Sequence, residues 1–185
     1  MNLRHAISDA LVQRGYSRKE RTHLLQVDNE CSWVVDTGPL NSKRTDIAPF
    51  VGIRVNALED LTSTLLEVPS DDSNASVGAN VGYVLGVGYK TYIPPTAPDR
   101  VMADIDDAVM RLQPYANLPK LPEVWKLTGV YDPGWRYRDI AIKLLTGHHG
   151  EILRSLAEAR KEFCEYEDEV CDQFLAFERN VRSRL

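Results

Sequence analysis

The chain has 185 residues, of which 43% are hydrophobic and 26% are charged, and its formal net charge is −5. These values are those of an ordinary globular protein, and the length fits one domain or at most two small ones. The acidic balance argues against a dedicated nucleic-acid binder, which usually carries a basic patch, and is compatible with a basic partner.

The sequence contains no segment that predicts membrane insertion. Residues 1–15 mix charged with apolar residues, so they do not resemble a signal peptide. No run approaches the roughly 20 apolar residues that a membrane-spanning helix needs. We therefore expect no membrane partner.

The three cysteines are Cys31, Cys164 and Cys171, an odd number for a disulfide framework. If Cys164 and Cys171 share one helix, they lie about 10 Å apart along its axis, which is beyond the reach of a disulfide. A cytoplasmic location, where thiols stay reduced, is the simplest interpretation.

Hydrophobic periodicity predicts a helix and then short strands at the start of the chain. Leu3, Ile7 and Leu11 share one helical face, and Gly15 fits the C-terminal cap. After a basic connector, alternating apolar residues predict three antiparallel strands joined by hairpin-sized loops. The predicted elements are a helix over residues 1–14, the connector over 16–21, and strands over 22–28, 31–36 and 47–55.

Residues 77–90 alternate apolar residues with Gly78, Gly82, Gly86 and Gly88, which predicts a strand with one nearly bare face. Glycines on one face of a strand indicate a bend or a close neighbour. We take this strand, which ends at a double proline, as the centre of the sheet. We expect the molecule's own helices to cover the bare face.

Helices dominate the rest of the predicted chain. A helical stripe begins at Asn56, and Thr96 is the expected N-cap of a later helix. Four prolines and several aromatic residues between residues 114 and 135 predict irregular chain. The predicted helices cover residues 56–68, 96–112, 136–146 and 148–185, the last of these as one helix or as two.

These elements predict an α+β fold. It consists of an antiparallel β-meander of about four strands packed with helices, and of a mostly helical C-terminal half. We expect a single domain over residues 1–185, with a helix-plus-sheet half over 1–95 and a helical half over 96–185.

Common catalytic and cofactor motifs do not fit the sequence. Lys90 follows the last glycine but precedes extended chain, whereas a P-loop lysine opens a helix. His148 and His149 are adjacent, so they cannot face one metal ion on a regular helix. Cys164 and Cys171 lack zinc-ligand spacing, and acidic neighbours disfavour a reactive thiolate at Cys164. We predict no metal, no cofactor and no catalytic residue, and we lean towards a protein that is not an enzyme.

Acidic residues recur in clusters at residues 71–72, 104–107 and 165–169, and residues 131–138 contain Trp, Tyr and Arg. The latter types are enriched at binding hot spots. A solvated face and a loop pinned to the core are the alternative explanations. The candidate binding residues are Asp104, Asp107, Glu167, Asp168, Trp135, Arg136 and Arg138.

The layout resembles that of a known family. Gly15, Tyr16, Arg18 and Lys19 follow the N-terminal helix, a meander comes next, and Leu-Leu-x-Gly occurs at residues 144–147 in the helical half. This layout resembles a bacterial family of unknown function, whose small α+β domains often occur beside secreted toxins and are suspected immunity proteins. The resemblance implies no catalytic residues, since that family has none established.

Three hypotheses follow. The first is a non-enzymatic cytoplasmic interaction domain, of immunity type, that offers an acidic and partly aromatic surface to a basic protein partner. The alternative is a small-molecule-binding protein or enzyme with a pocket between the glycine-rich strand and residues 125–138. The third is a structural subunit, in which a homodimer or larger assembly buries the apolar stripe of residues 163–181. The sequence leaves the oligomeric state open.

Overall fold

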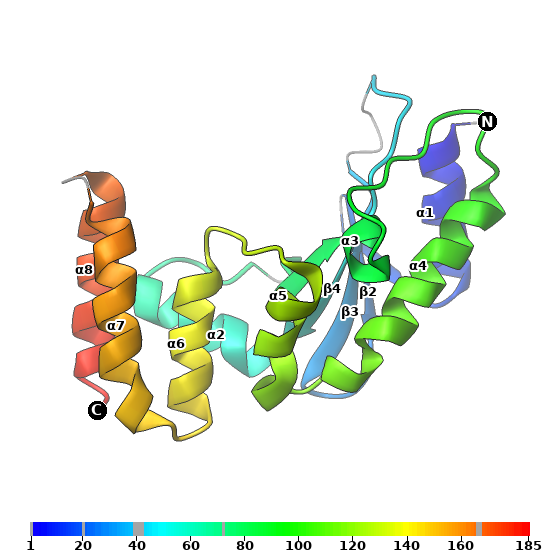
Figure 1. The fold of residues 1–185 in the computed structure, drawn as a ribbon. Coiled ribbons are helices and arrows are strands. Elements are labelled where there is room, and N and C mark those ends of the chain that lie inside the picture. Colours follow the sequence, from blue (N-terminus) through cyan, green and yellow to red (C-terminus); the bar gives the residue numbers. More distant parts are fainter. Residues whose placement is uncertain (1, 20, 39–42, 72, 166–167) are drawn as a thin grey trace. The chain divides into compact units, whose positions relative to one another are not determined.

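The computed structural model describes residues 2–19, 21–38, 43–71, 73–165 and 168–185 (Figure 1). One five-stranded antiparallel sheet and a mostly helical C-terminal half confirm the predicted α+β class. No helix in these ranges has both the length and the apolarity needed to cross a bilayer.

The chain divides into two compact units, residues 1–55 with 72–130 and residues 56–71 with 131–185. Two compact units of one chain can belong to one domain or form two domains. The single domain over residues 1–185 therefore remains a prediction. Each unit is described by itself below.

The first unit contains the sheet. Its strands pair in the order β1-β2-β3-β4-β5, so each strand lies beside its neighbours along the chain. The strands are β1 (Ser17–Lys19), β2 (Thr22–Gln26), β3 (Cys31–Asp36), β4 (Phe50–Val55) and β5 (Val77–Asn80). The helices are α1 (Leu3–Gln13), α3 (Val81–Leu85), α4 (Pro98–Leu112) and α5 (Leu121–Thr128), with 3-10 turns η1 (Gln113–Tyr115) and η2 (Leu118–Lys120).

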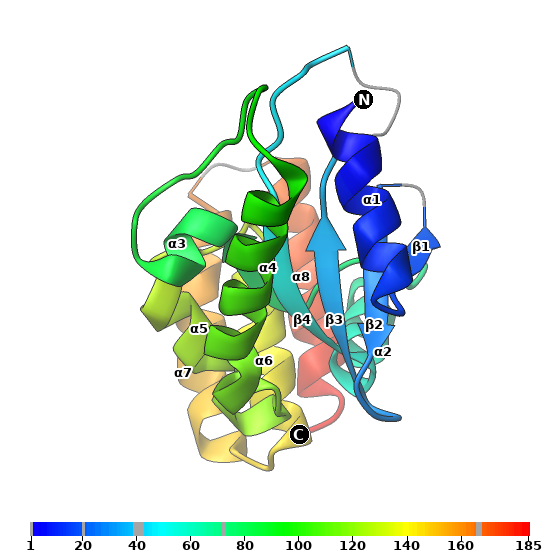
Figure 2. The same ribbon diagram turned by 90° about the vertical axis from the view of Figure 1, so that its right-hand side faces the viewer.

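Helices α1 and α4 contact each other and lie together over the sheet, α1 against β2 and α4 against β4 (Figure 2). Their apolar stripes supply fully buried side chains, among them Ile7, Leu11 and Ile105. Burying such stripes against a sheet is the main stabilising contribution in a fold of this kind. Helices α3 and α5 pack against β5.

The second unit consists of four helices: α2 (Asn56–Leu66), α6 (Trp135–Leu145), α7 (His149–Phe163) and α8 (Glu169–Arg182). Helix α2 contacts α6 and α8, and α7 also contacts α6 and α8, so the contacts close into a ring. Tyr137, Phe163, Phe174 and Phe177 stack on one another inside it. In the third hypothesis an assembly buries the apolar stripe of residues 163–181; Phe174, Phe177 and Val181 of that stripe are already buried within one chain, whereas Val170 is exposed.

Several predicted boundaries need correction. The connector contains the short strand β1, and the segment expected to be irregular contains α5. Thr96 is not an N-cap: α4 begins at Pro98, whose missing N–H is no loss in the first turn. The third predicted strand is shorter than expected, because Ile47 pairs with Tyr92 in an isolated bridge.

The glycine-rich stretch is the largest error. Only residues 77–80 form a strand, and that strand is at the edge of the sheet, where we expected a long central strand. Helix α3 follows at once and ends at Gly86, whose φ of 79° is the left-handed conformation that glycine adopts without strain. The alternation of Val and Tyr with glycine predicts a strand over residues 77–90. The structure instead has a strand over residues 77–80 and a helix over residues 81–85.

The Asn80 side chain explains why the strand stops. Its Oδ1 accepts hydrogen bonds from the backbone N–H of Gly82 at 2.9 Å and of Lys90 at 2.8 Å. Its Nδ2 donates to the carbonyl oxygens of Pro49 at 3.3 Å and Lys90 at 2.9 Å. One amide therefore caps α3 and fastens the returning chain to it.

The glycines allow close backbone approaches, but the neighbours are not those that we expected. Gly78 pairs with Gly52 across the sheet, and a Cβ at Gly78 would lie 2.6 Å from the Gly52 Cα. At Gly82, a Cβ would collide with the Gly88 carbonyl oxygen and lie 2.6 Å from the Lys90 Cβ. The chain's own residues 88–90, rather than a separate helix, occupy that side of Gly82.

We therefore expect Gly82→Ala to destabilise the protein by about 1–3 kcal/mol, the usual cost of overpacking a close contact. Gly150→Ala is the control, since Gly150 lies in α7 with no atom within 4 Å of its would-be Cβ. Alanine there should stabilise the helix by up to about 1 kcal/mol. Urea unfolding measures both variants, and an unchanged free energy for Gly82→Ala would show that residues 88–90 do not press on Gly82.

Candidate functional site

The candidate residues from the sequence fall into both units. Asp104 and Asp107 lie on α4 in the first unit. Trp135, Arg136 and Arg138 lie on α6 in the second, and Asp168 precedes α8 there. Glu167 is outside the described residues. The structure therefore divides this set between two units, and each part has its own role.

Asp104 does not belong to an exposed acidic surface. It is 5% exposed, and its Oδ2 accepts hydrogen bonds from Lys90 Nζ and Tyr92 Oη, both at 2.7 Å, while Arg100 Nε lies 3.5 Å away. Burial alone would raise the pKa of Asp104, but the hydrogen bonds from Lys90 and Tyr92 outweigh it and lower the pKa. This carboxylate ties α4 to the chain that follows α3.

Asp107 is exposed one turn along the same helix. Its neighbour Asp106 pairs at 3.1 Å with Arg14, which directly follows α1, whereas Asp107 has no such partner in the described part of the chain. Asp107 thus remains a free surface charge of the first unit.

Trp135 and Arg136 do form a local cluster. Tyr131, which is half exposed, meets the Trp135 ring edge-on at 4.8 Å between centroids. The Arg136 guanidinium lies 4.1 Å from the centroid of the Trp135 ring. Arg136 also pairs with Glu162 of α7 at 2.8 Å, so the aromatic pair is fixed beside the second half of α7.

Arg138 is an internal connection between α2 and α6. Its Nε lies 3.0 Å from Glu59, and its Nη1 lies 2.9 Å from Asp132. Burial would lower the pKa of Arg138, but the charges of Glu59 and Asp132 raise it overall. Because both partners come from the chain itself, we assign Arg138 to stability.

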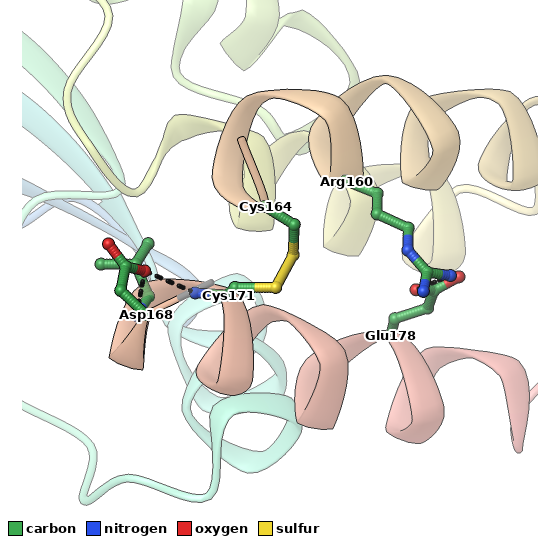
Figure 3. The surroundings of a disulfide bond; sticks show 6 residues. Arg160, Cys164, Asp168, Cys171 and Glu178 are labelled. Atoms are coloured by element: carbon green, nitrogen blue, oxygen red, sulfur yellow. Dashed lines mark hydrogen bonds and ion pairs between the residues drawn. A yellow bond between two sulfur atoms is a disulfide. The ribbon is translucent and has the colours of Figure 1, made fainter. Parts of the chain in front are cut away.

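A disulfide joins Cys164 to Cys171, with Cα atoms 4.6 Å apart (Figure 3). We expected the two sulfur atoms to be out of reach of each other if both cysteines lay on one helix. They do not lie on one helix, so that expectation was wrong. Helix α7 ends at Phe163, and α8 begins at Glu169. The argument for a reducing cytoplasm, which rested on unpaired thiols, loses its support, and Cys31 is the free and buried cysteine.

Asp168 starts α8. Its Oδ1 accepts hydrogen bonds from the backbone N–H of Val170 at 3.0 Å and of Cys171 at 3.2 Å, as an N-cap does (Figure 3). The sequence held this signal, since an Asp before an acidic residue and an apolar run typically begins a helix. A helix start at Asp168 favours the alternative in which residues 148–185 form two helices, and with two helices the cysteines can come together.

Around the disulfide lie four exposed carboxylates, which we call the acidic tip: Glu165, Asp168, Glu169 and Asp172. Within the described residues none of the four takes part in an ion pair. Sequence reasoning selected only Asp168 of this group as a candidate, although it noted the cluster around it.

A hollow of about 410 Å³ lies beside the disulfide and is lined by Arg160, Cys164, Cys171, Asp172 and Leu175. Arg160 reaches Glu178 of α8 at 3.6 Å and so helps to close the α7–α8 pair below the tip. The disulfide therefore borders an open space.

Other reactive side chains do not assemble into a site. Ser8 Oγ lies 2.8 Å from His23 Nε2, but both residues are fully buried, so no substrate can approach. Burial lowers the pKa of His23. Across the described ranges, no group of three or more His, Cys, Asp or Glu side chains is placed to hold a metal ion.

Comparisons with protein-family models, with curated proteins and with solved structures find no match to this chain. The resemblance to suspected immunity proteins therefore stays a prediction. The alternative pocket between the glycine-rich strand and residues 125–138 also remains a prediction. Trp125 is buried in the first unit, while Trp135 and Arg136 belong to the second.

The two α4 carboxylates give a matched test. Asp104→Asn should cost about 2–3 kcal/mol, because Lys90 and Tyr92 lose a buried charged partner, whereas Asp107→Asn should stay within about 0.5 kcal/mol. The low folded pKa of Asp104 means that its contribution is present above the unfolded pKa of about 3.9 and is lost as the pH falls through the folded value. Asp104→Asn should therefore flatten the acid limb of stability measured by urea unfolding. Equal losses for both variants would contradict this assignment.

Proposed function

We propose that this protein is a non-enzymatic interaction domain whose acidic tip binds a basic protein, and that it acts as an inhibitor of immunity type. One observation carries the proposal: the acidic tip presents four exposed carboxylates without cationic partners, while the buried carboxylates of the same unit are paired. Charges left unneutralised on a fixed scaffold attract and orient an oppositely charged partner.

The scaffold beneath the tip supports the proposal. The disulfide and the Asp168 cap hold the end of α7 and the start of α8 together. A binding surface that is ordered before association avoids the entropic cost of ordering it on contact.

The aromatic pair lies near the same end of α7. Glu162, which pairs with Arg136 beside Trp135, is in the last turn of α7, and Glu165 follows three residues further on, just after the helix ends. Trp and Tyr are frequent anchors of interfaces, and their ring faces attract Lys and Arg side chains. A basic partner therefore finds both charge and apolar anchoring area within the second unit.

We further propose that the protein works in the cytoplasm. In that compartment most disulfides are transient and respond to redox conditions. The Cys164–Cys171 bond beside the acidic tip would therefore form only under oxidising conditions.

The test is capture of host proteins on the immobilised protein, with two charge-reversed baits. Glu165→Lys with Glu169→Lys should retain the partner at least about tenfold less than the wild type, because two attractive charges become repulsive. Salt of about 0.5 M should release the partner from the wild type, since it screens exposed charges.

The control bait carries Asp9→Lys with Asp107→Lys, an equal change of net charge at exposed sites of the first unit. It should retain the partner as the wild type does. If all three baits capture the same proteins in equal amounts, or if the control loses the partner too, the acidic tip is not the binding surface.

A further inference from the structure

We infer that the Cys164–Cys171 disulfide is a redox-controlled clasp of the acidic tip, and that its reduction by a small thiol or a dithiol protein weakens the binding of a basic partner. The inference rests on the proposed function and adds a regulation of the same site.

The position of the disulfide gives it this control. Cys164 directly follows α7, and Cys171 lies in the first turn of α8. The carboxylates of the acidic tip stand on both sides of it and repel one another across this junction. On the α8 side of this junction, the Asp168 cap is the local restraint besides the disulfide. Removing the covalent bond therefore leaves like charges beside a first turn of α8 that is held mainly by this cap.

A reductant can reach the disulfide. The hollow of about 410 Å³ opens beside both sulfur-bearing residues, and Cys164 is partly exposed whereas Cys171 is 7% exposed. The carboxylates of the acidic tip repel an incoming thiolate, and the Arg160 guanidinium on the wall of the hollow, which also pairs with Glu178, offsets part of that repulsion. We expect the attack at the more accessible Cys164.

The exchange is balanced without any further group. A thiolate RS⁻ attacks the Cys164 sulfur, forms an RS–S–Cys164 bond and releases Cys171 as a thiolate. A second RS⁻ attacks the RS sulfur of this mixed disulfide and releases the Cys164 thiolate. Two RSH molecules are oxidised to RS–SR, the protein disulfide is reduced to two thiols, and both protein thiolates take up the protons that the two thiols released.

The rest of the second unit is built to survive the opening. The Phe163 ring stacks on Tyr137 at 5.0 Å and lies 5.4 Å from the Phe174 ring. Arg160 and Glu178 form their ion pair one turn away from the disulfide. Both contacts hold the last turn of α7 in place, since Arg160 and Phe163 lie in it. Reduction therefore loosens the first turn of α8 while the aromatic core stays packed, which is the behaviour of a local switch.

The experiment compares oxidised and dithiol-reduced protein by hydrogen exchange and by binding to an oligolysine peptide. In the reduced protein, amides in the first turn of α8 should exchange about tenfold faster or more, while amides of α2 and α6 keep their rates. Affinity for the peptide should fall about tenfold, since ordering even one more backbone residue on binding costs that much.

Two variants complete the design. Cys164→Ser with Cys171→Ser should behave as the reduced protein and ignore the reductant. Cys31→Ala should respond as the wild type does, because Cys31 is buried in the first unit. Unchanged exchange in the first turn of α8 after reduction would overturn the clasp.

The remaining outcomes separate regulation from function. Faster exchange with unchanged affinity would overturn the redox control and leave the binding function standing. No binding in either redox state, or binding that Glu165→Lys with Glu169→Lys leaves intact, would overturn the proposed function itself, and with it the regulation.

Discussion

A charge taken out of water has to be paired, and this constraint organises both units of the protein. In the first unit, buried Asp104 binds Lys90 and Tyr92, which fastens the chain after α3 to α4. In the second, Glu59 binds Arg138 between α2 and α6, and Glu178 binds Arg160 and Arg182 at the α7–α8 pair. Except for Glu178–Arg182, which lies within α8, each pair links two different segments of the chain.

The same constraint sets apart the acidic tip. Its carboxylates are exposed, so water solvates them and the fold does not require partners for them. Like charges gathered at one helix junction are slightly unfavourable, and a disulfide beside them offsets that repulsion. A binding surface for a basic protein requires exposed charges that the fold itself does not use. The disulfide beside the acidic tip also makes this the part of the unit that a reductant changes most easily.

The sequence predicted the fold class and most elements, because hydrophobic periodicity reports directly on burial. It predicted β3 with correct bounds, since Cys31, Trp33 and Val35 alternate inward. It did not predict α3, because five residues rich in Val and Gly carry too little periodicity, and the deciding hydrogen bonds come from Asn80 to residues as far as Lys90. The roles of Asp104 and Asp168 depended on partners and helix ends that a single sequence shows only as acidic clusters.

The central claim is that the carboxylates of the acidic tip, apart from the Asp168 cap, have no structural role, and urea unfolding of Glu165→Gln with Glu169→Gln tests it most directly. We expect the free energy of unfolding to stay within about 0.5 kcal/mol, because less repulsion offsets the lost interaction of Glu169 with the α8 dipole. Glu59→Gln, which leaves Arg138 buried without that charge, should by contrast cost about 3 kcal/mol. A loss at the tip as large as that of Glu59→Gln would contradict the account, since those carboxylates would then be needed by the fold.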